Sequence, residues 1–505
     1  MSVTAQEATE RAPLEADTEY FDLIIIGAGI SGLGAAYRIT ERDPAIGYVI
    51  LERRGQIGGT WDLFRYPGVR SDSSIFTLCF PYEPWTRKEG VADGVHIREY
   101  LIATAQKYGI DRHIRFNSQV RSADWDSSTD TWIISAEQNG ATKRYRSRFV
   151  FFGSGYYNYD EGYTPEFVGI ERFGGIVVHP QHWPENLDYT GKRLVVIGSG
   201  ATAISLIPSL AARAAKVTML QRSPTYLIAA PRYSLFADVL RKVLPRRLAH
   251  PILRMFNALL EGVVWILARK TPAFMKWLLR RMAVKNLPEG YDVDTHFKPR
   301  YRPWDQRLCL IPDADLYRTI SEGRAEVVTD HIDYFDDTGI VLKSGTHLDA
   351  DIIVTATGLQ LQALGGVTLS LDGAEIKPQD RFVYKAHMLE GVPNLFWCVG
   401  YTNASWTLRA DMTARATAKL LAYMKSHGYT HAYPDRGGEP MPEKPSWDIQ
   451  AGYVLRSPHA LPKSGTRRPW HVRQNYFADA IDYRFDRITE AMVFGRVGER
   501  ARSAS

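Results

Sequence analysis

Cysteine is scarce in this chain of 505 residues. Cys79, Cys309 and Cys398 are its only thiols, and they are far apart in the sequence. Isolated thiols argue against a disulfide framework, a CxxC redox pair and a thiolate zinc site, because each of these needs a defined set of cysteines. Such sparse use of cysteine is typical of a reducing compartment. We therefore expect a cytoplasmic protein.

Long apolar runs and a strong charge bias are also lacking. The closest approach to a membrane span, residues 259–268 (LLEGVVWILA), is short and contains Glu261, whereas a spanning helix needs about 20 apolar residues. A net charge of +6 is too diffuse to indicate a nucleic-acid partner. Residues 1–18 mix acids and bases without an apolar core, so we expect a disordered tail and not a signal peptide.

Glycine, by contrast, occurs in a pattern that binds phosphates. An apolar strand, residues 22–26 (DLIII), runs directly into a loop and a helix rich in small residues. A GxGxxG loop permits a tight turn, a close approach of backbone to a diphosphate, and contact between helix and strand. The next strand ends in Glu52, where an acid accepts hydrogen bonds from a ribose. This unit predicts an adenosine with a free ribose diol, bound by the loop residues Gly27, Gly29, Ser31 and Gly32.

The same pattern recurs later in the chain. An apolar strand, residues 194–197, precedes a GxGxxA loop and another helix. Arg222 and Ser223 stand near the end of the following strand, where the first unit has its acid. A guanidinium suits a 2′-phosphate that a carboxylate would repel, although Arg222 is also compatible with a solvated surface arginine. We expect NADP(H) here, on the loop residues Gly198, Ser199, Gly200, Ala201, Thr202 and Ala203.

Two nucleotide-binding units in this order, FAD type and then NADPH type, indicate a flavin-dependent oxidoreductase. We expect an α/β flavoprotein with two dinucleotide-binding domains of Rossmann type and a helical insert. The predicted order is a disordered tail (1–18), a first part of the FAD-binding domain (19–157), an NADP-binding domain (158–349) with the insert at about 232–300, and a second part of the FAD-binding domain with the C-terminal region (350–505).

The missing CxxC excludes a disulfide reductase and leaves a reaction of reduced flavin with oxygen. Residues 173–184, FGGIVVHPQHWP, fit the pattern FxGxxxHxxxWP just before the second Rossmann strand. This pattern resembles the fingerprint of Baeyer–Villiger monooxygenases, whereas flavin N- and S-oxygenases have a related motif without the Trp-Pro ending. Further motifs resemble the EthA-type, prodrug-activating group of that family over nearly the whole chain after the tail, among them GGTWDLFRYPGVRSDS, SGYYNYDEGY, LQRSPTY, WDQRLCLIP and VGYTNASWTL.

This resemblance implies cofactor contacts for individual residues. Val120 would contact the adenine of FAD through its backbone, and Arg70 and Ser71 would lie beside the NADP. The GGTWDL segment would lie along the flavin and its diphosphate through Gly59, Thr60, Trp61, Asp62 and Leu63.

The resemblance also implies a catalytic pair, Arg307 and Asp72. In the family, NADPH reduces FAD, oxygen forms a C4a-peroxyflavin, and this attacks a ketone to give an ester or lactone. Anionic intermediates need a fixed cation, which Arg307 supplies without losing its proton while Asp72, which also borders the FAD, orients it. Some relatives have lysine where this chain has Gln306, so their kinetics do not transfer directly.

The partners expected are oxygen and a small hydrophobic ketone or sulfide, and no nucleic acid. Oxygenation of sulfides or thioamides is expected beside the ketone reaction. The alternatives are a flavin N- or S-monooxygenase without Baeyer–Villiger activity and, more remotely, a non-catalytic flavin-binding redox module.

The histidines of the FGGIVVHPQHWP stretch do not indicate a metal site. Pro180 separates His179 from His182, and no third ligand lies at metal spacing nearby. The stretch enters the second nucleotide domain, where a hinge is needed. We expect His179 and Trp183 to fix this hinge, and we assign no role to His182.

Basic residues gather in one segment, from Ser234 to Lys285. This segment has eleven Lys and Arg residues against Asp238 and Glu261, so its charge exceeds that of the whole chain. Apolar and aromatic side chains interleave at helical spacing. The segment is either a helical subdomain with a solvated basic face or an amphipathic insert that contacts an anionic membrane peripherally.

Overall fold

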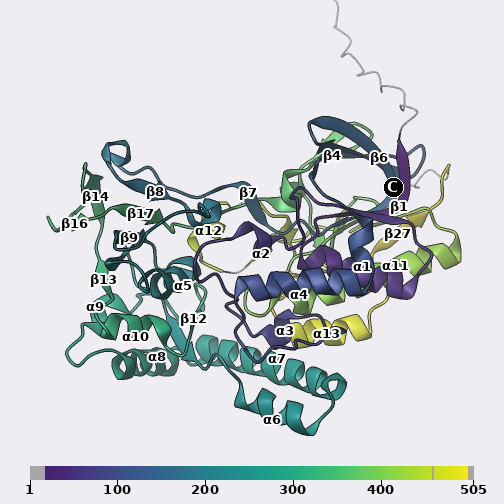
Figure 1. Ribbon diagram of the computed structural model, residues 1–505. Helices are drawn as coiled ribbons and strands as arrows, with labels where there is room; N and C mark the ends of the chain where they lie inside the picture. The colour runs from purple at the N-terminus through teal and green to yellow at the C-terminus, as the bar shows by residue number, and fades with distance from the viewer. Residues whose placement is uncertain (1–17, 448, 458–459, 499–505) are drawn as a thin grey trace, which may run out of the picture.

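Two sheets, each accompanied by helices, form the body of the protein (Figure 1). The computed structural model describes residues 18–447, 449–457 and 460–498. Of the tail predicted over residues 1–18, all but Thr18 lies outside the described residues. The predicted α/β class with two dinucleotide-binding units is confirmed by this arrangement.

The first sheet combines strands from both ends of the chain. Its interior strand β1 (Glu19–Ile26) is buried because Leu23, Ile24 and Ile25 are apolar on both faces. β1 is parallel to both of its neighbours, β2 and β6. In spatial order the strands are β20 (Ala374–Ile376), β19 (Thr368–Leu371), β4 (Ser118–Asp126), β5 (Thr131–Gln138), β6 (Ala141–Phe152), β1 (Glu19–Ile26), β2 (Tyr48–Leu51) and β3 (Ile114–Arg115), with β23 (Leu395–Trp397) also paired to β6.

The second sheet is parallel throughout. In spatial order its strands are β13 (Ala325–Thr329), β10 (Lys216–Gln221), β9 (Arg193–Ile197), β17 (Ile352–Thr355) and β8 (Ile176–Val178). The boundary predicted between residues 349 and 350 is therefore wrong. β17 is fully buried and pairs with β9 on one side and β8 on the other, so the chain leaves this sheet only after Thr355.

The helix that follows each glycine loop packs on its sheet: α1 (Ile30–Arg42) in the first unit and α5 (Ala201–Leu210) in the second. α1 also packs against α11 (Trp406–His427), which brings the C-terminal region to the first site. The remaining helices outside the insert are α2 (Thr60–Leu63), α3 (Ile75–Leu78), α4 (Gly94–Lys107), α10 (Asp315–Ser321), α12 (Gly452–Leu455) and α13 (Tyr476–Arg484).

The helical insert lies along the lower edge of the molecule in Figure 1. The chain enters the insert after β11 (Leu227–Ala230) and returns from it at β12 (Cys309–Pro312). These two strands pair in parallel. The helices of the insert are α6 (Leu235–Val243), α7 (Arg246–Lys270), α8 (Pro272–Asn286) and α9 (Val293–His296).

From the sequence, no segment was expected to reach the length of a membrane span, but helix α7 reaches it. Its 25 residues are long and apolar enough to cross a bilayer by length and composition, yet only 22% of its apolar window is buried. The sequence pattern hides this because single polar residues interrupt the apolar run, whereas the helix continues through them.

The two sheets are joined by a two-stranded antiparallel ribbon, β7 (Tyr157–Gly162) with β18 (Leu359–Leu361). One strand carries the chain out of the first sheet and the other brings it back. Smaller strand groups complete the fold: β14 (Ile332–Phe335), β15 (Gly339–Leu342) and β16 (His347–Asp349), then the pairs β21 (Val383–Tyr384) with β22 (Met388–Leu389), β24 (His431–Pro434) with β27 (Met492–Gly495), and β25 (Lys444–Pro445) with β26 (Lys463–Ser464).

Candidate functional site

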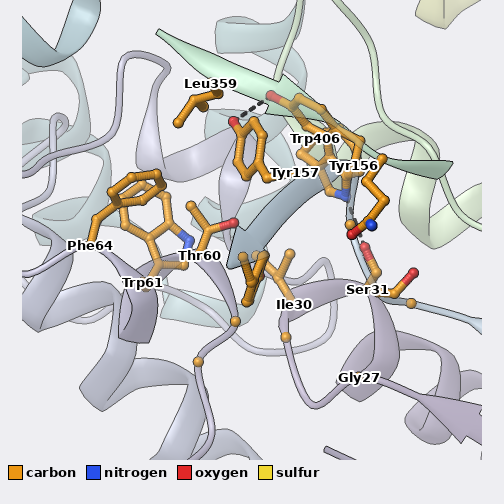
Figure 2. Close-up of a pocket in the computed structure, with 18 of the residues that line it drawn as sticks. Gly27, Ile30, Ser31, Thr60, Trp61, Phe64, Tyr156, Tyr157, Leu359 and Trp406 are labelled. Carbon is orange, nitrogen blue, oxygen red and sulfur yellow. Dashed lines mark hydrogen bonds between the residues drawn. The ribbon is translucent and has the colours of Figure 1, made fainter. Parts of the chain in front are cut away.

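A cavity of about 410 Å³ lies between the two glycine loops. Figure 2 shows part of its lining, which comes from the first glycine loop, α2, the β6–β7 turn and α11. The cavity brings together these predicted site residues: Gly27, Gly29, Ser31, Glu52, Gly59, Thr60, Trp61, Arg70, Ser71, Asp72, Val120, Gly200, Ala201, Thr202 and Arg307.

Other predicted site residues do not line the cavity. Gly198, Ser199, Arg222 and Ser223 lie outside the cavity, on the side of the second glycine loop, and Arg222 and Ser223 are exposed. The remaining ones are packed into the protein or belong to the stretch 173–184: Gly32, Asp62, Leu63, Ala203, His179 and Trp183.

The N-terminus of α1 is open to an anion. Its N-cap, Gly29, offers no side chain, so within the described residues no cap hydrogen bond occupies the first backbone N–H groups. Gly59 lies directly beside Gly29 on the cavity wall: a Cβ on Gly59 would lie 3.0 Å from the Gly29 Cα. The two glycines thus form a cradle of bare backbone that side chains would fill, and it fits a diphosphate.

Gly32 allows α1 to pack closely on the glycine loop, and it does not line the cavity. A Cβ at this position would lie 1.9 Å from the backbone oxygen of Gly27, which itself has a positive φ of 99°. Only glycine therefore lets α1 approach the end of β1 this closely.

Glu52 is almost completely buried beside the first glycine loop. Its carboxylate accepts hydrogen bonds from the backbone N–H groups of Ala28, at 2.6 Å, and Arg54, at 2.8 Å. Burial raises the pKa of this carboxyl group. A carboxylate has about four acceptor positions, so acceptor capacity remains for a ribose diol at the cavity edge.

Asp62 and Leu63 differ from the prediction that they lie along the flavin. The Asp62 carboxylate points away from the cavity and pairs with three guanidinium groups: Arg54 Nε at 2.6 Å, Arg98 at 3.2 Å, and Arg65. Leu63 lies in the core of the second domain. The reason is geometric: successive residues on the short helix α2 point in different directions, so Thr60 and Trp61 face the cavity while the next two face the protein.

The predicted catalytic pair is formed in the cavity. Arg307 Nε lies 2.8 Å from Asp72 Oδ2, and its terminal nitrogen donates to Oδ1 at 3.0 Å, so the guanidinium is held at two points. Arg307 comes from the loop before β12 and Asp72 from the first domain. Burial alone would lower the pKa of Arg307, but the surrounding negative charge, foremost that of Asp72, raises it above its usual value.

Arg70 lines the cavity and also forms an ion pair. Its guanidinium donates to the Asp315 carboxylate at 2.5 Å, from the first domain to α10 of the second. The neighbouring Ser71 hydroxyl donates to the backbone oxygen of Ser73 at 2.9 Å. Both residues thus lie on the loop that joins the two sites.

Aromatic residues that were not assigned a role from the sequence line the same cavity as the Asp72–Arg307 pair. The hydroxyl groups of Tyr156 and Tyr157 are hydrogen-bonded to each other (Figure 2). The Tyr156 ring stacks on Trp406, with centroids 5.0 Å apart, and meets Trp447 edge-on. Trp406 in turn donates to the hydroxyl of Ser31 at 2.8 Å. Trp406 and Trp447 come from the distant C-terminal region, so local sequence gives no signal for this contact.

At its middle glycine the second glycine loop is more open than the first. Gly200 caps α5 without a side chain, and a Cβ there would meet nothing within 4 Å in the described structure. The Ser199 hydroxyl donates to the backbone oxygen of Ser223 at 3.1 Å, which ties the loop to the strand end that carries Arg222. Ala203 is fully buried and occupies the position that glycine takes in the first unit.

Arg456 is a second cation close to Arg222, and sequence reasoning missed it. Its guanidinium stacks on the Tyr163 ring, 3.6 Å from the centroid. Burial lowers its pKa, and the nearby charge of Arg222 lowers it further. Arg456 follows α12 in the C-terminal region, so only the folded chain brings it towards Arg222.

His179 binds the interdomain ribbon. Its Nδ1 accepts from the backbone N–H of Gln181 at 3.2 Å, and its Nε2 lies 3.3 Å from the backbone oxygen of Gly358. Burial lowers the pKa of this histidine, so the neutral ring with Nε2–H donating fits both contacts. A Cβ on Gly162 would overlap the His179 ring, which shows how tightly β7 packs here.

Trp183 is buried in the core of the second domain, edge-on to Tyr189 at 6.4 Å. Within the described part of the chain, no group of three or more His, Cys, Asp or Glu side chains is placed to hold a metal ion. The stretch 173–184 is thus a strand, β8, followed by a turn that contacts the ribbon.

Comparisons with known proteins agree with this geometry. The family model described as flavin-binding monooxygenase-like matches residues 22–363. The FAD-containing monooxygenase EthA of Mycolicibacterium smegmatis is 49% identical over 489 residues, which cover 97% of this chain and 99% of that protein. The Mycobacterium tuberculosis protein of the same name is 50% identical over 463 residues, covering 92% and 95%.

Solved structures share the fold at lower identity. An oxidized steroid monooxygenase bound to NADP superposes with a TM-score of 0.75 at 22% identity, covering 94% of this chain and all of that one. A cyclohexanone monooxygenase from Rhodococcus sp. Phi1 bound to NADP+ gives 0.73 at 18% identity, covering 95% and 100%. Because the family model spans most of the chain, and relatives of this similarity align over nearly its whole length, the protein belongs to the flavin-binding monooxygenase-like family.

Proposed function

We propose that this protein is an NADPH- and oxygen-consuming FAD monooxygenase of Baeyer–Villiger type, which converts ketones to esters or lactones. The observation that carries the proposal is the Asp72–Arg307 pair, held at two points in a cavity between two glycine loops. The names of the relatives support FAD, and those of the solved structures support NADP and ketone monooxygenases.

The residues present fit both cofactors. The bare backbone at Gly29 and Gly59, with the buried acid Glu52, fits the diphosphate and ribose of FAD. Gly200, with Arg222 at the neighbouring strand end, fits the diphosphate and 2′-phosphate of NADPH. When bound, FAD supplies acceptance of hydride from NADPH and activation of oxygen.

The contribution of the chain itself is a permanent positive charge at a fixed position. Arg307 keeps its proton at any physiological pH, because its pKa is raised above an already high value. It can therefore stabilise negative charge that develops on oxygen during attack on a carbonyl. Asp72 prevents the guanidinium from turning away, and the aromatic wall of Tyr156 and Trp406 limits the access of water.

Oxygenation of sulfide or thioamide sulfur in the same cavity belongs to this proposal. Transfer of oxygen to a soft nucleophile does not need an anionic adduct on the substrate. We therefore expect this reaction to depend less on Arg307 than ester formation does. A cytoplasmic location is also proposed, and it is supported by three cysteines that are all free thiols.

The test is product analysis with the full-length, FAD-loaded protein. NADPH, isotopically labelled oxygen and a panel of cyclic and linear ketones should give esters or lactones that carry one labelled oxygen atom. A sulfide panel is run in parallel. Sulfoxides alone would instead indicate an S-oxygenase, and consumption of NADPH without any oxygenated product would contradict both assignments.

A further inference from the structure

Between its two basic ends, helix α7 has its charged and histidine side chains turned towards the protein. His250 lies 3.0 Å from the backbone oxygen of Phe80, and Arg254 donates to the backbone oxygens of Thr77 and Cys79 at 2.9 and 2.7 Å. Farther along the helix, Glu261 accepts from the Thr77 hydroxyl at 2.8 Å. The inward side also buries Leu253 and Ala258, but an ordinary surface helix would turn its polar side chains towards solvent.

The opposite side of α7 is apolar and exposed. Every exposed residue from Leu248 to Leu267 is apolar, and we call this surface the α7 outer face. Six of its side chains are each between 43% and 50% exposed: Ile252, Met255, Phe256, Leu259, Leu260 and Val263. A continuous apolar surface of this kind is costly in water and marks a contact surface.

The neighbouring helices extend the α7 outer face. Phe236 of α6 contacts Phe256 of α7, with ring centroids 4.6 Å apart. Leu235 and Val243 of α6 are 82% and 69% exposed. On α8, Trp277 is 53% exposed. The three helices lie together along one edge of the molecule (Figure 1).

Basic side chains stand at both ends of the α7 outer face. Arg246 and Arg247 are exposed at the start of the helix, and Lys270 is exposed at its end, next to Arg269, which pairs with Asp305 at 3.3 Å. The acidic Glu261 of this segment faces the protein, where it is hydrogen-bonded. An apolar strip flanked by cations is complementary to a bilayer with anionic headgroups, where lysine and arginine sit at headgroup level and apolar side chains lie below. A second copy of the chain would oppose cations to cations.

We propose that the α7 outer face, with α6 and α8, docks the protein on the surface of an anionic lipid bilayer. The helix lies flat in the headgroup region and does not span the membrane. Spanning would strip His250, Arg254 and Glu261 of their hydrogen-bond partners on the protein. Docking leaves all these contacts in place and covers only side chains that are already exposed.

Docking and the proposed oxidation are tested separately. The experiment uses the full-length, FAD-loaded protein and vesicles of phosphatidylglycerol with phosphatidylcholine, or of phosphatidylcholine alone. We expect co-sedimentation with the anionic vesicles at least tenfold above that with the zwitterionic ones, and weaker binding at higher salt. The triple variant Ile252→Gln/Leu259→Gln/Ile266→Gln should reduce binding at least tenfold, since these side chains, which are 43%, 49% and 51% exposed, are apolar contacts of the docking surface.

Two further variants test whether basic side chains contribute to vesicle binding and whether the effect is specific to this surface. Arg246→Gln with Arg247→Gln should weaken binding roughly tenfold and flatten its salt dependence, because each basic residue near an anionic surface contributes separately. Val168→Gln changes a side chain that is 72% exposed in the second domain and should bind like the wild type. FAD content and NADPH oxidation should be unchanged in every variant.

Three results would overturn the proposal. The first is a lack of sedimentation with anionic vesicles. The second is equal sedimentation of the wild type and the triple variant. The third is self-association of the wild type without lipid that the triple variant abolishes in analytical ultracentrifugation, because the occupant would then be a second copy of the chain.

Discussion

The two glycine loops are built on one plan but differ in how tightly they are enclosed. At the first loop, Gly32 packs so closely on Gly27 that a methyl group would clash, and the acid Glu52 is buried. At the second, Ala203 is accepted at the matching position, and Arg222 is exposed. The first unit is thus closed around its ligand position, whereas the second is open.

This difference suits two ligands with different residence times. A cofactor that stays through many turnovers needs a preorganised, enclosed site, whereas a cosubstrate that exchanges in each turnover needs an accessible one. The Asp72–Arg307 pair stands where the two regions meet. The comparison therefore predicts that damage to the first loop removes a cofactor, and damage to the second changes an affinity.

The largest effect is expected for Gly32→Ala. The added Cβ would lie 1.9 Å from the Gly27 oxygen, so α1 must move away from β1. We expect a loss of stability of about 3 kcal/mol or more and protein purified without FAD. The measurements are the ratio of flavin to protein absorbance and the melting temperature. Ala203→Gly is the matched change at the second loop and should retain FAD, and equal damage by both changes would contradict the comparison.

The next effect is expected for Arg222→Ala. Loss of a charge-assisted contact to a 2′-phosphate costs about 1.5–3 kcal/mol, so the KM for NADPH should rise about 10- to 100-fold with little change in kcat. The KM for NADH should not change, since NADH lacks that phosphate. Arg324→Ala, which removes another exposed arginine of the second domain, serves as the control. If NADPH and NADH respond alike, Arg222 does not read the 2′-phosphate.

A smaller effect, with a defined pH dependence, is expected for Glu261→Gln. Glu261 anchors α7 to the first domain through Thr77 and Ser405, and burial raises its pKa to about 6. Because the folded state holds the proton more tightly than the unfolded one, this group's contribution to stability is complete below pH 4.5 and is lost as the pH rises through about 6. The glutamine variant should lack this loss and be more stable than the wild type by about 2 kcal/mol at pH 7.

The measurement for Glu261→Gln is urea unfolding at pH 4.5 and pH 7. The gain should appear at the higher pH and be small at the lower one. Ser426→Ala, a change on the exposed surface of α11, should give the same difference from the wild type at both values. A gain in Glu261→Gln that is independent of pH would show that the carboxyl group does not titrate with a raised pKa.

The sequence predicted what depends on local backbone chemistry. Gly27, Gly29 and Gly200 line the cavity, as predicted, because a glycine loop between a strand and a helix constrains its own geometry. The Asp72–Arg307 contact joins residues far apart in the chain, and only the family resemblance indicated it. No local pattern would have brought these two residues together.

What the sequence did not predict depends on long-range packing. Arg456 and Trp406 reach the cavity region from the C-terminal part of the chain. Asp62 lies within a motif that was expected along the flavin, but three arginines from separate positions hold it in the opposite direction. The polar contacts of α7 with α3 and its flanking residues likewise decide which side of that helix is exposed.

Arg307 has the central role in the proposed reaction, and the direct test of this role is the amount of ester formed per NADPH consumed in Arg307→Ala. The variant should bind FAD normally, because the flavin cradle at Gly29 and Gly59 is untouched. Ester yield from a ketone should fall by about 100-fold or more, while NADPH oxidation continues and sulfide oxygenation falls less. Ester formation at the wild-type yield would contradict the assignment of Arg307 and Asp72.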